Sequence, residues 1–189
     1  MGRILEIRWH GRGGQGVVLA SRILAKACFL EGKWAQAFPF FGAERRGAPV
    51  TAFNRISDRP IRRRSQIYSP DILVFVDPMF LRMPGALSGL KEGGSLIANT
   101  HLPPEEVKAR AALIATVPAT DIAVKLKLSV AGLSVPNTVM LGALSRATGI
   151  VRLSSLKEAI KGLVREDMLE LNRKAMELGY EKVRIYSPS

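Results

Sequence analysis

Apolar and polar residues alternate in several short stretches of the chain, and each stretch predicts a strand. In residues 4–10 the apolar side chains occupy every second position, between Glu6, Arg8 and His10. This period of two is typical of a strand with one buried face. Residues 72–76 are apolar throughout, as in a strand covered on both faces, and residues 94–99 and 112–117 are predicted as further buried strands. Further strands are predicted at residues 33–37, 50–56, 61–67 and 183–186, with 50–56 and 61–67 forming a hairpin.

Helical patterns separate these strands. The first helix is predicted from Val17 to a terminating Gly32, and short helical pieces follow at residues 87–91 and 103–107. Later helices are predicted over residues 120–128 and 137–147, after a capping box at 155–158, and over 167–178, where Gly179 ends the helix. Small residues let another element approach the helix over 137–147 closely: Gly142, Ala143 and Ala147.

This order of elements predicts the fold class. Strands that alternate with helices favour a mostly parallel sheet, so we expect a three-layer α/β/α domain with a Rossmann-like opening. The chain has 189 residues, which suits one domain over residues 1–189.

Composition limits the environment of the protein. No apolar run approaches the ~20 residues that a membrane span needs, and Glu6, Arg8 and His10 interrupt any signal-peptide core. We therefore expect a cytoplasmic protein with no membrane partner. The single cysteine, Cys28, can form no internal disulfide and cannot hold an iron–sulfur cluster, and we expect it in the core.

The formal net charge of +12 indicates an acidic partner, which could be a nucleic acid, an anionic ligand or an acidic protein surface. The densest basic cluster is residues 59–64, which is either a solvated loop face or a contact with a partner subunit. A nucleic acid is the least favoured partner, because the chain shows no recognition helix and no aromatic platform for bases.

A glycine-rich stretch joins the first strand to the first helix. Gly11, Gly13 and Gly16 fit the pattern G-x-G-x-x-G in the strand–turn–helix setting that a dinucleotide or phosphate site needs. Residues 33–38 contain no acidic residue for an adenine ribose, which argues against NAD. The alternative is a tight turn that holds helix against strand without a ligand.

Residues 38–49 form a second candidate, predicted as a long loop. It combines three phenylalanines with Glu44, Arg45 and Arg46, and long ordered loops usually bind something. In the alternative reading the phenylalanines tuck under the loop and the arginines face water.

Motifs of catalysis are missing from the sequence. No Ser-His-Asp order, H-E-x-x-H pattern or Walker lysine occurs, and His10 and His101 stand alone as structural residues. We therefore predict no catalytic residue and no metal ligand, which fits a ligand-holding subunit better than a self-sufficient enzyme.

Taken together, the motifs resemble one known family. The stretches at residues 11–17 (Gly-Arg-Gly-Gly-Gln-Gly-Val) and 41–50 (Phe-Gly-Ala-Glu-Arg-Arg-Gly-Ala-Pro-Val) come in order with those at 61–65, 70–71, 76–77 and 137–144. Over nearly the whole chain they resemble the gamma subunit of 2-oxoacid:ferredoxin oxidoreductases. The second stretch is closest to the pyruvate type, with branched 2-oxoacids left open.

The resemblance implies a subunit of pyruvate synthase that is inactive when isolated. Such assemblies contain alpha, beta, gamma and delta subunits, decarboxylate pyruvate oxidatively on thiamine diphosphate, reduce ferredoxin through iron–sulfur clusters and form acetyl-coenzyme A. The resemblance places no cofactor on this chain alone, and coenzyme A is the co-substrate that it would approach. The residues expected to face coenzyme A or the partner subunits are Gly11, Arg12, Gly13, Gly14, Gln15, Gly16, Gly42, Glu44, Arg45, Arg46 and Gly47. The alternative is a stand-alone nucleotide-binding protein that uses the glycine turn.

Overall fold

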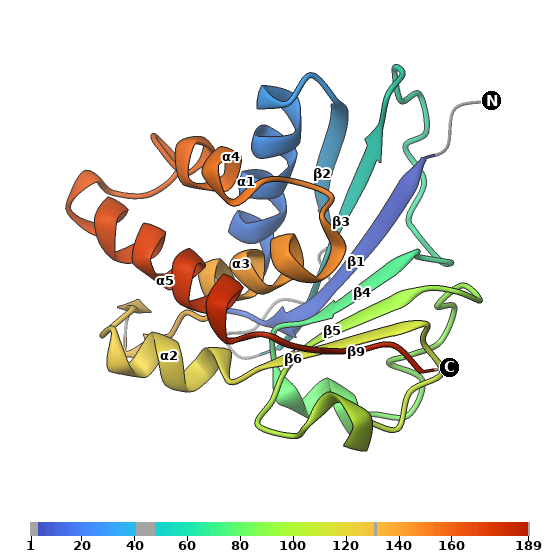
Figure 1. Cartoon of the computed structure of the whole chain (residues 1–189). Coiled ribbons are helices and arrows are strands. Elements are labelled where there is room, and N and C mark those ends of the chain that lie inside the picture. Colours follow the sequence, from blue (N-terminus) through green and yellow to red (C-terminus); the bar gives the residue numbers. More distant parts are fainter. Residues whose placement is uncertain (1–3, 41–47, 131, 189) are drawn as a thin grey trace.

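A seven-stranded sheet organises the chain (Figure 1). The structure, a computed structural model, describes residues 4–40, 48–130 and 132–188. The strands of the sheet are β1 (Leu5–Arg12), β2 (Trp34–Phe40), β3 (Pro49–Ser57), β4 (Ile72–Phe75), β5 (Ser95–Asn99), β6 (Leu113–Val117) and β9 (Arg184–Tyr186). Two shorter strands, β7 (Ser129–Val130) and β8 (Leu133–Ser134), form a separate hairpin.

The sheet is mixed, with a parallel centre and antiparallel flanks. Its order is β2-β3-β1-β4-β5-β6-β9, in which β1, β4, β5 and β6 pair in parallel. On one side β3 pairs antiparallel with both β1 and β2, and at the other edge β9 pairs antiparallel with β6. Five of the seven strands thus share one direction, and the expected α/β fold is confirmed.

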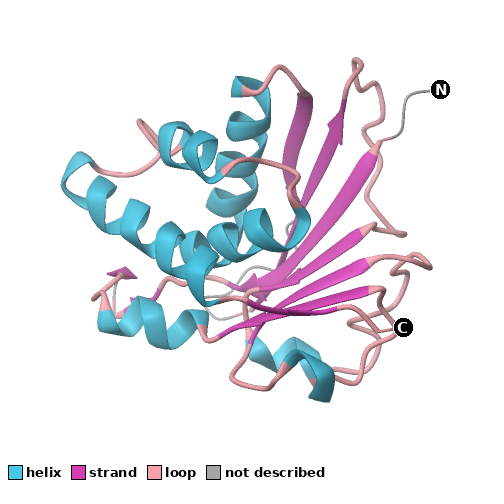
Figure 2. Ribbon diagram, viewed as in Figure 1, coloured by secondary structure: helices cyan, strands magenta, loops and turns pink. Residues whose placement is uncertain are grey.

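Helices cover one face of this sheet (Figure 2). They are α1 (Val17–Leu30), α2 (Ala119–Lys125), α3 (Asn137–Thr148), α4 (Leu153–Ala159) and α5 (Leu169–Lys182), with the 3₁₀ turn η3 (Glu166–Met168) before α5. Alternate apolar residues of the strands, such as Trp9, Val74 and Ile97, are fully buried beneath them. No helix of the described residues is both long enough and apolar enough to cross a membrane.

The opposite face carries a thinner layer. Leu73, Phe75 and Leu96 point to this side and are buried under residues 78–111, which contain the 3₁₀ turns η1 (Pro78–Leu81) and η2 (Pro104–Glu106). Beside them, the polar positions of β1 lie on the same face, because side chains alternate along a strand.

Two glycines set the contact between α3 and α5. A Cβ on Gly142 would lie 1.9 Å from the carbonyl oxygen of Met176, and one on Gly179 would lie 2.0 Å from that of Val139. The helices therefore cross with backbone against backbone. The prediction of a close approach at Gly142 is confirmed, but Gly179 is wrong as a helix end, since α5 continues to Lys182.

Other predicted boundaries need correction. Residues 61–67 form no strand, because β2 and β1 already occupy both edges of β3 and leave no edge for a hairpin partner. Residues 87–91 are turns, not a helix. The capping box at 155–158 is wrong, since α4 begins at Leu153 and ends at Ala159. The predicted loop from Phe38 starts later, since β2 extends to Phe40.

Candidate functional site at the carboxyl edge of the sheet

The glycine turn lies where the sequence placed it. β1 ends at Arg12, the turn follows at Gly13–Gly16, and α1 begins at Val17 (Figure 1). The turn thus sits at the carboxyl edge of the parallel strands, the edge at which open α/β sheets bind ligands.

Side chains from the turn tie it to the next parallel strand. The Gln15 side chain accepts a hydrogen bond from the Arg12 N–H (2.8 Å) and donates one to Asp77 Oδ2 (2.8 Å). Asp77 follows β4, and its second oxygen accepts from the N–H of Met79 (2.9 Å) and so caps η1. Arg12 Nε lies 3.3 Å from Asp77 Oδ2, while its side chain remains 42% exposed. Asp77 therefore fixes the turn, and the partly exposed guanidinium of Arg12 lies beside it.

The glycines of the turn serve contacts within the chain. Gly14 and Gly16 have φ angles of 98° and 75°, a region that side chains disfavour. A Cβ on Gly14 would lie 2.8 Å from Leu133 Cδ1, and one on Gly16 would lie 2.3 Å from Asn137 Nδ2. Part of the space above the turn is thus taken by the β7–β8 hairpin and the start of α3. These contacts agree with the part of the alternative in which the turn serves packing within the chain, although the partners are the β7–β8 hairpin and α3.

Two asparagines hold neighbouring segments at the same edge. Asn99, at the end of β5, donates to the carbonyl of Val76 (2.8 Å) and to Thr120 Oγ1 (2.7 Å), and its side-chain oxygen accepts from the N–H of Thr120 (3.2 Å). Asn137 donates to the carbonyl of Gly16 (3.1 Å). Both side chains are almost fully buried. These residues were not among the predicted site residues.

A cleft opens beside the turn, beyond the ends of β4 and β5. It consists of two adjoining hollows of about 850 Å³ and about 500 Å³, which share Pro78, Arg82, Thr100 and Leu102. Asp77 and Lys108 line the larger hollow, whose wall is mostly apolar. The cleft combines mostly apolar walls with charged side chains of both signs, the cations Arg82 and Lys108 and the carboxylates Asp77, Glu106 and Asp121. Such a lining suits a ligand with an apolar body and polar or charged groups.

The second predicted site segment, with Gly42, Glu44, Arg45, Arg46 and Gly47, lies outside the described residues. The residues on either side of it are at the carboxyl edge. Phe40 pairs with Thr51, and the carbonyl of Ala48 accepts from the N–H of Gly13 (3.0 Å). The glycine turn is thus bonded directly to the residue at which that segment ends.

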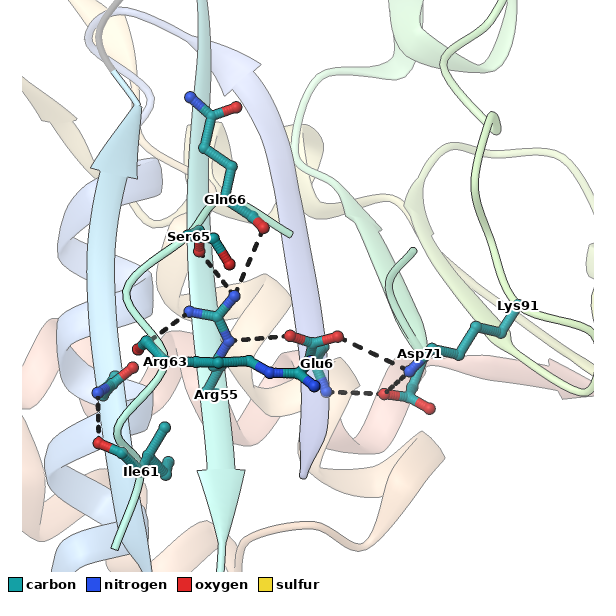
Figure 3. A network of polar contacts seen from close by, with 9 residues as sticks. Glu6, Arg55, Ile61, Arg63, Ser65, Gln66, Asp71 and Lys91 are labelled. Atoms are coloured by element: carbon teal, nitrogen blue, oxygen red, sulfur yellow. Dashed lines mark hydrogen bonds and ion pairs between the residues drawn. The ribbon is translucent and has the colours of Figure 1, made fainter. Parts of the chain in front are cut away.

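A second polar cluster, missed by the sequence analysis, lies at the opposite edge. Arg55 is 1% exposed, and its Nε donates to Glu6 Oε1 (2.9 Å), the residue directly across the β1–β3 ladder (Figure 3). Glu6 also lies 3.8 Å from Lys91 Nζ, which pairs with Asp71 at 3.0 Å. The available signal was a pair of opposite charges on two predicted strands, but the sequence analysis paired residues 50–56 with 61–67 and not with residues 4–10.

His10 is half-buried on the same face as Glu6. It packs between Phe75 and Phe80, and its Nε2 accepts from Arg8 Nε (3.0 Å), so the ring is neutral. Burial, and secondarily the cation of Arg8, lowers the pKa of His10 to about 4. The predicted structural role of His10 agrees with this packing. His101 Nε2 lies 3.2 Å from Asp121 Oδ2, and both side chains are exposed.

The glycine turn and the cleft lie together at the carboxyl edge of a mixed sheet, and this arrangement defines the class of protein. The arrangement is that of an α/β domain that presents one edge to a ligand or to another chain.

Comparisons with known proteins identify the family. The family model "Pyruvate ferredoxin/flavodoxin oxidoreductase" matches residues 6–182. The common gamma subunit of the pyruvate/ketoisovalerate oxidoreductases of Thermococcus litoralis is 52% identical over 187 residues, 97% of this chain and 99% of that protein. The gamma subunit of the NADH-dependent phenylglyoxylate dehydrogenase of Aromatoleum evansii is 46% identical over 182 residues, 96% and 95% of the two chains. The crystal structure of pyruvate oxidoreductase subunit PORC from Thermotoga maritima matches with a TM-score of 0.82 and 40% identity, covering 98% and 99%.

The chain belongs to the pyruvate ferredoxin/flavodoxin oxidoreductase family, and within it to the gamma-type subunits. The resemblance seen in the sequence is thereby confirmed. The alternative of a stand-alone nucleotide-binding protein finds no support, because these relatives are named as subunits of oxidoreductases.

Proposed function

We propose that the chain is the gamma subunit of a pyruvate:ferredoxin oxidoreductase, which forms acetyl-coenzyme A and CO₂ from pyruvate and passes the electrons to ferredoxin. The observation that carries this proposal is the 52% identity with a pyruvate/ketoisovalerate oxidoreductase gamma subunit over 97% of the chain. Relatives that act on other 2-oxoacids are nearly as similar, so the choice of pyruvate is the part that the experiment must decide.

The cofactors of the reaction belong, in this proposal, to alpha, beta and delta partner subunits. The donor set of this chain does not fit an iron–sulfur cluster, because its single cysteine is Cys28. That thiol is fully buried in α1, and burial raises its pKa to about 12. The sequence also lacks the Gly-Asp-Gly…Asn pattern that holds thiamine diphosphate. The whole chain, residues 1–189, would then act as a single domain that supports assembly of the complex.

The carboxyl edge is the side that we assign to coenzyme A. Arg12 is partly exposed at the turn, and Arg82 and Lys108 line the adjoining cleft. Guanidinium groups bind phosphates with two parallel hydrogen bonds, and an apolar wall suits the pantetheine arm. Arg45 and Arg46, which stand in the sequence between β2 and β3, are proposed to contact coenzyme A phosphates or acidic groups of the alpha subunit.

Reconstitution tests the proposal. The partner subunits are expressed with and without this chain, and pyruvate- and coenzyme A-dependent reduction of a viologen dye is measured. We expect activity only with the chain present, and higher activity with pyruvate than with branched or aromatic 2-oxoacids. Equal activity without the chain would contradict the proposal, and a preference for another 2-oxoacid would correct the substrate.

The coenzyme A assignment has its own test in the same assembly. Arg12→Ala, Arg45→Ala and Arg82→Ala should each raise the KM for coenzyme A by about tenfold, the loss of one charge-assisted hydrogen bond, with little change in the KM for pyruvate. Arg165→Ala is the matched control, because Arg165 is exposed in the segment before α5 and pairs with Asp167. An unchanged KM in an intact assembly removes the corresponding arginine from the site.

A further inference from the structure

The most basic segment of the chain, which we call the arginine strap (residues 59–68), crosses the amino edge of the sheet between β3 and β4 (Figure 1). This edge lies opposite the glycine turn, because Leu5 at the start of β1 pairs with Ile56 near the end of β3. The strap has no strand or helix of its own, so its carbonyl groups need other hydrogen-bond donors.

A buried arginine supplies several of these donors from beneath. The guanidinium of Arg55 donates to the carbonyls of Ser65 (2.7 Å), Arg63 (3.4 Å) and Gln66 (3.5 Å) while its Nε is paired with Glu6 (Figure 3). The guanidinium also lies 5.3 Å from the ring centroid of Phe38. The buried guanidinium of Arg55, paired with the carboxylate of Glu6, thus holds the backbone of the strap.

The ends of the strap are held in the same way. Gln36 donates to the carbonyl of Ile61 (3.0 Å), and Arg8 donates to the carbonyl of Tyr68 (3.3 Å). Between them the side chain of Ile67 is 2% exposed and anchors the strap to the core. These hydrogen bonds and the buried side chain of Ile67 therefore fix the backbone of the strap over residues 61–68 from the side that faces the sheet.

The side chains on the other side of the strap are cationic and aromatic. Arg59, Arg62, Arg63 and Arg64 are exposed, and the ring of Tyr68 is 72% exposed. The ion pairs found among the described residues involve none of these four arginines. No carboxylate of the described residues thus pairs directly with these four arginines, and a partner with negative charge would offset their mutual repulsion.

We propose that the arginine strap docks an acidic surface segment of another subunit of the oxidoreductase assembly. The inference rests on the proposed function, which requires partner subunits, and adds where one of them binds and by what chemistry. Arginine and tyrosine are among the residues most enriched at the energetic centres of protein interfaces. A backbone that is already ordered lowers the entropy lost on binding. The strap is irregular and presents no helix for a nucleic-acid groove, so a protein partner is favoured over a nucleic acid.

The first test removes the charge of the strap. The variant Arg62→Gln, Arg63→Gln, Arg64→Gln is mixed with the remaining subunits of the assembly, and the dissociation constant is measured at about 50 mM and about 300 mM salt, since screening weakens such contacts. We expect binding about tenfold or more weaker at low salt, and a smaller salt dependence than in the wild type. The matched control is the variant Lys161→Gln, Lys174→Gln, Lys182→Gln, which should bind like the wild type. It removes three exposed cations, one just after α4 and two on α5.

A second measurement identifies the partner. A photo-crosslinking amino acid at position 68, in the assembled enzyme, should capture a segment rich in Asp and Glu from another subunit. Wild-type affinity of the strap variant, or no crosslink in an intact assembly, overturns the docking proposal. Loss of RNA or anionic-vesicle binding with unchanged assembly also overturns it. If the wild-type chain itself fails to assemble, the proposed function fails instead, so the two failures are distinguishable.

Discussion

The two edges of the sheet hold their irregular segments with different side chains. At the carboxyl edge the neutral amides of Gln15, Asn99 and Asn137 hold the turn and the strand ends. At the amino edge the guanidiniums of Arg8 and Arg55 supply most of the donors to the strap, and the amide of Gln36 supplies one at Ile61. An amide has two donors, while a guanidinium has more donors in a fixed fork and holds several carbonyls at once. The guanidinium, however, stays buried only with a carboxylate beside it, here Glu6. The comparison therefore predicts that charge and pH affect the amino edge more than the carboxyl edge.

The largest effect is expected where the buried charge loses its partner. Arg55→Met should lower the free energy of unfolding by about 3–5 kcal/mol, because it leaves the buried carboxylate of Glu6 with only its 3.8 Å contact to Lys91 and leaves the strap carbonyls without their donor. Urea denaturation followed by circular dichroism measures this. The double variant Glu6→Leu, Arg55→Met should recover part of the loss. A loss below about 1 kcal/mol for Arg55→Met would show that the pair does not hold this edge.

The next effect concerns pH. The folded pKa of His10 is about 4, below its ordinary value of 6.5, so the unfolded chain binds the proton more readily. Stability is therefore full above pH 6.5 and falls as the pH is lowered towards 4, by at most about 3 kcal/mol for this group. Hydrogen exchange should show residues 59–68 opening before residues 11–16, because protonated His10 repels Arg8. The variant His10→Gln should lose this pH dependence; an unchanged slope would assign it to other groups.

The smallest effect is expected at the carboxyl edge. Asn99→Ala should lower the free energy of unfolding by about 2 kcal/mol, since it leaves the buried carbonyl of Val76 without its donor. The loss should be the same at low and high salt, because the amide carries no charge. Thermal denaturation at two salt concentrations measures both points, with Thr120→Val as a control that removes one of the hydrogen bonds of Asn99. A salt-dependent loss would contradict the contrast between the edges.

Local patterns predicted most strands and the glycine turn, since alternation and turn residues act within a few positions. Pairing across the sheet was less accessible. Residues 61–67 have strand composition, but β3 has no free edge, a fact decided by the positions of β1 and β2. Gly179 looks like a helix end, yet it lies inside α5 because α3 crosses there.

The candidate site was predictable only in part, for a similar reason. Gln15 belongs to a motif and was found. Asp77, Asn99 and Asn137 are single polar residues, and their importance comes from the segments that the fold brings to them. For Asp77 and Asn99, the only local sign in the sequence was an Asp or Asn at the end of a buried strand.

The strand order also bears on how the chain can fold during synthesis. Of the strands in this sheet, β1 is made first, and it lies inside the sheet. On one side of it the next strands are added in the order of translation: β4, β5, β6 and finally β9. Each new strand on that side therefore finds its neighbour already made. The crossing of α3 by α5 and the pairing of β9 with β6 form after the other strands have been made. A nascent chain stalled before α5 would therefore carry a nearly complete sheet with an uncovered helical face.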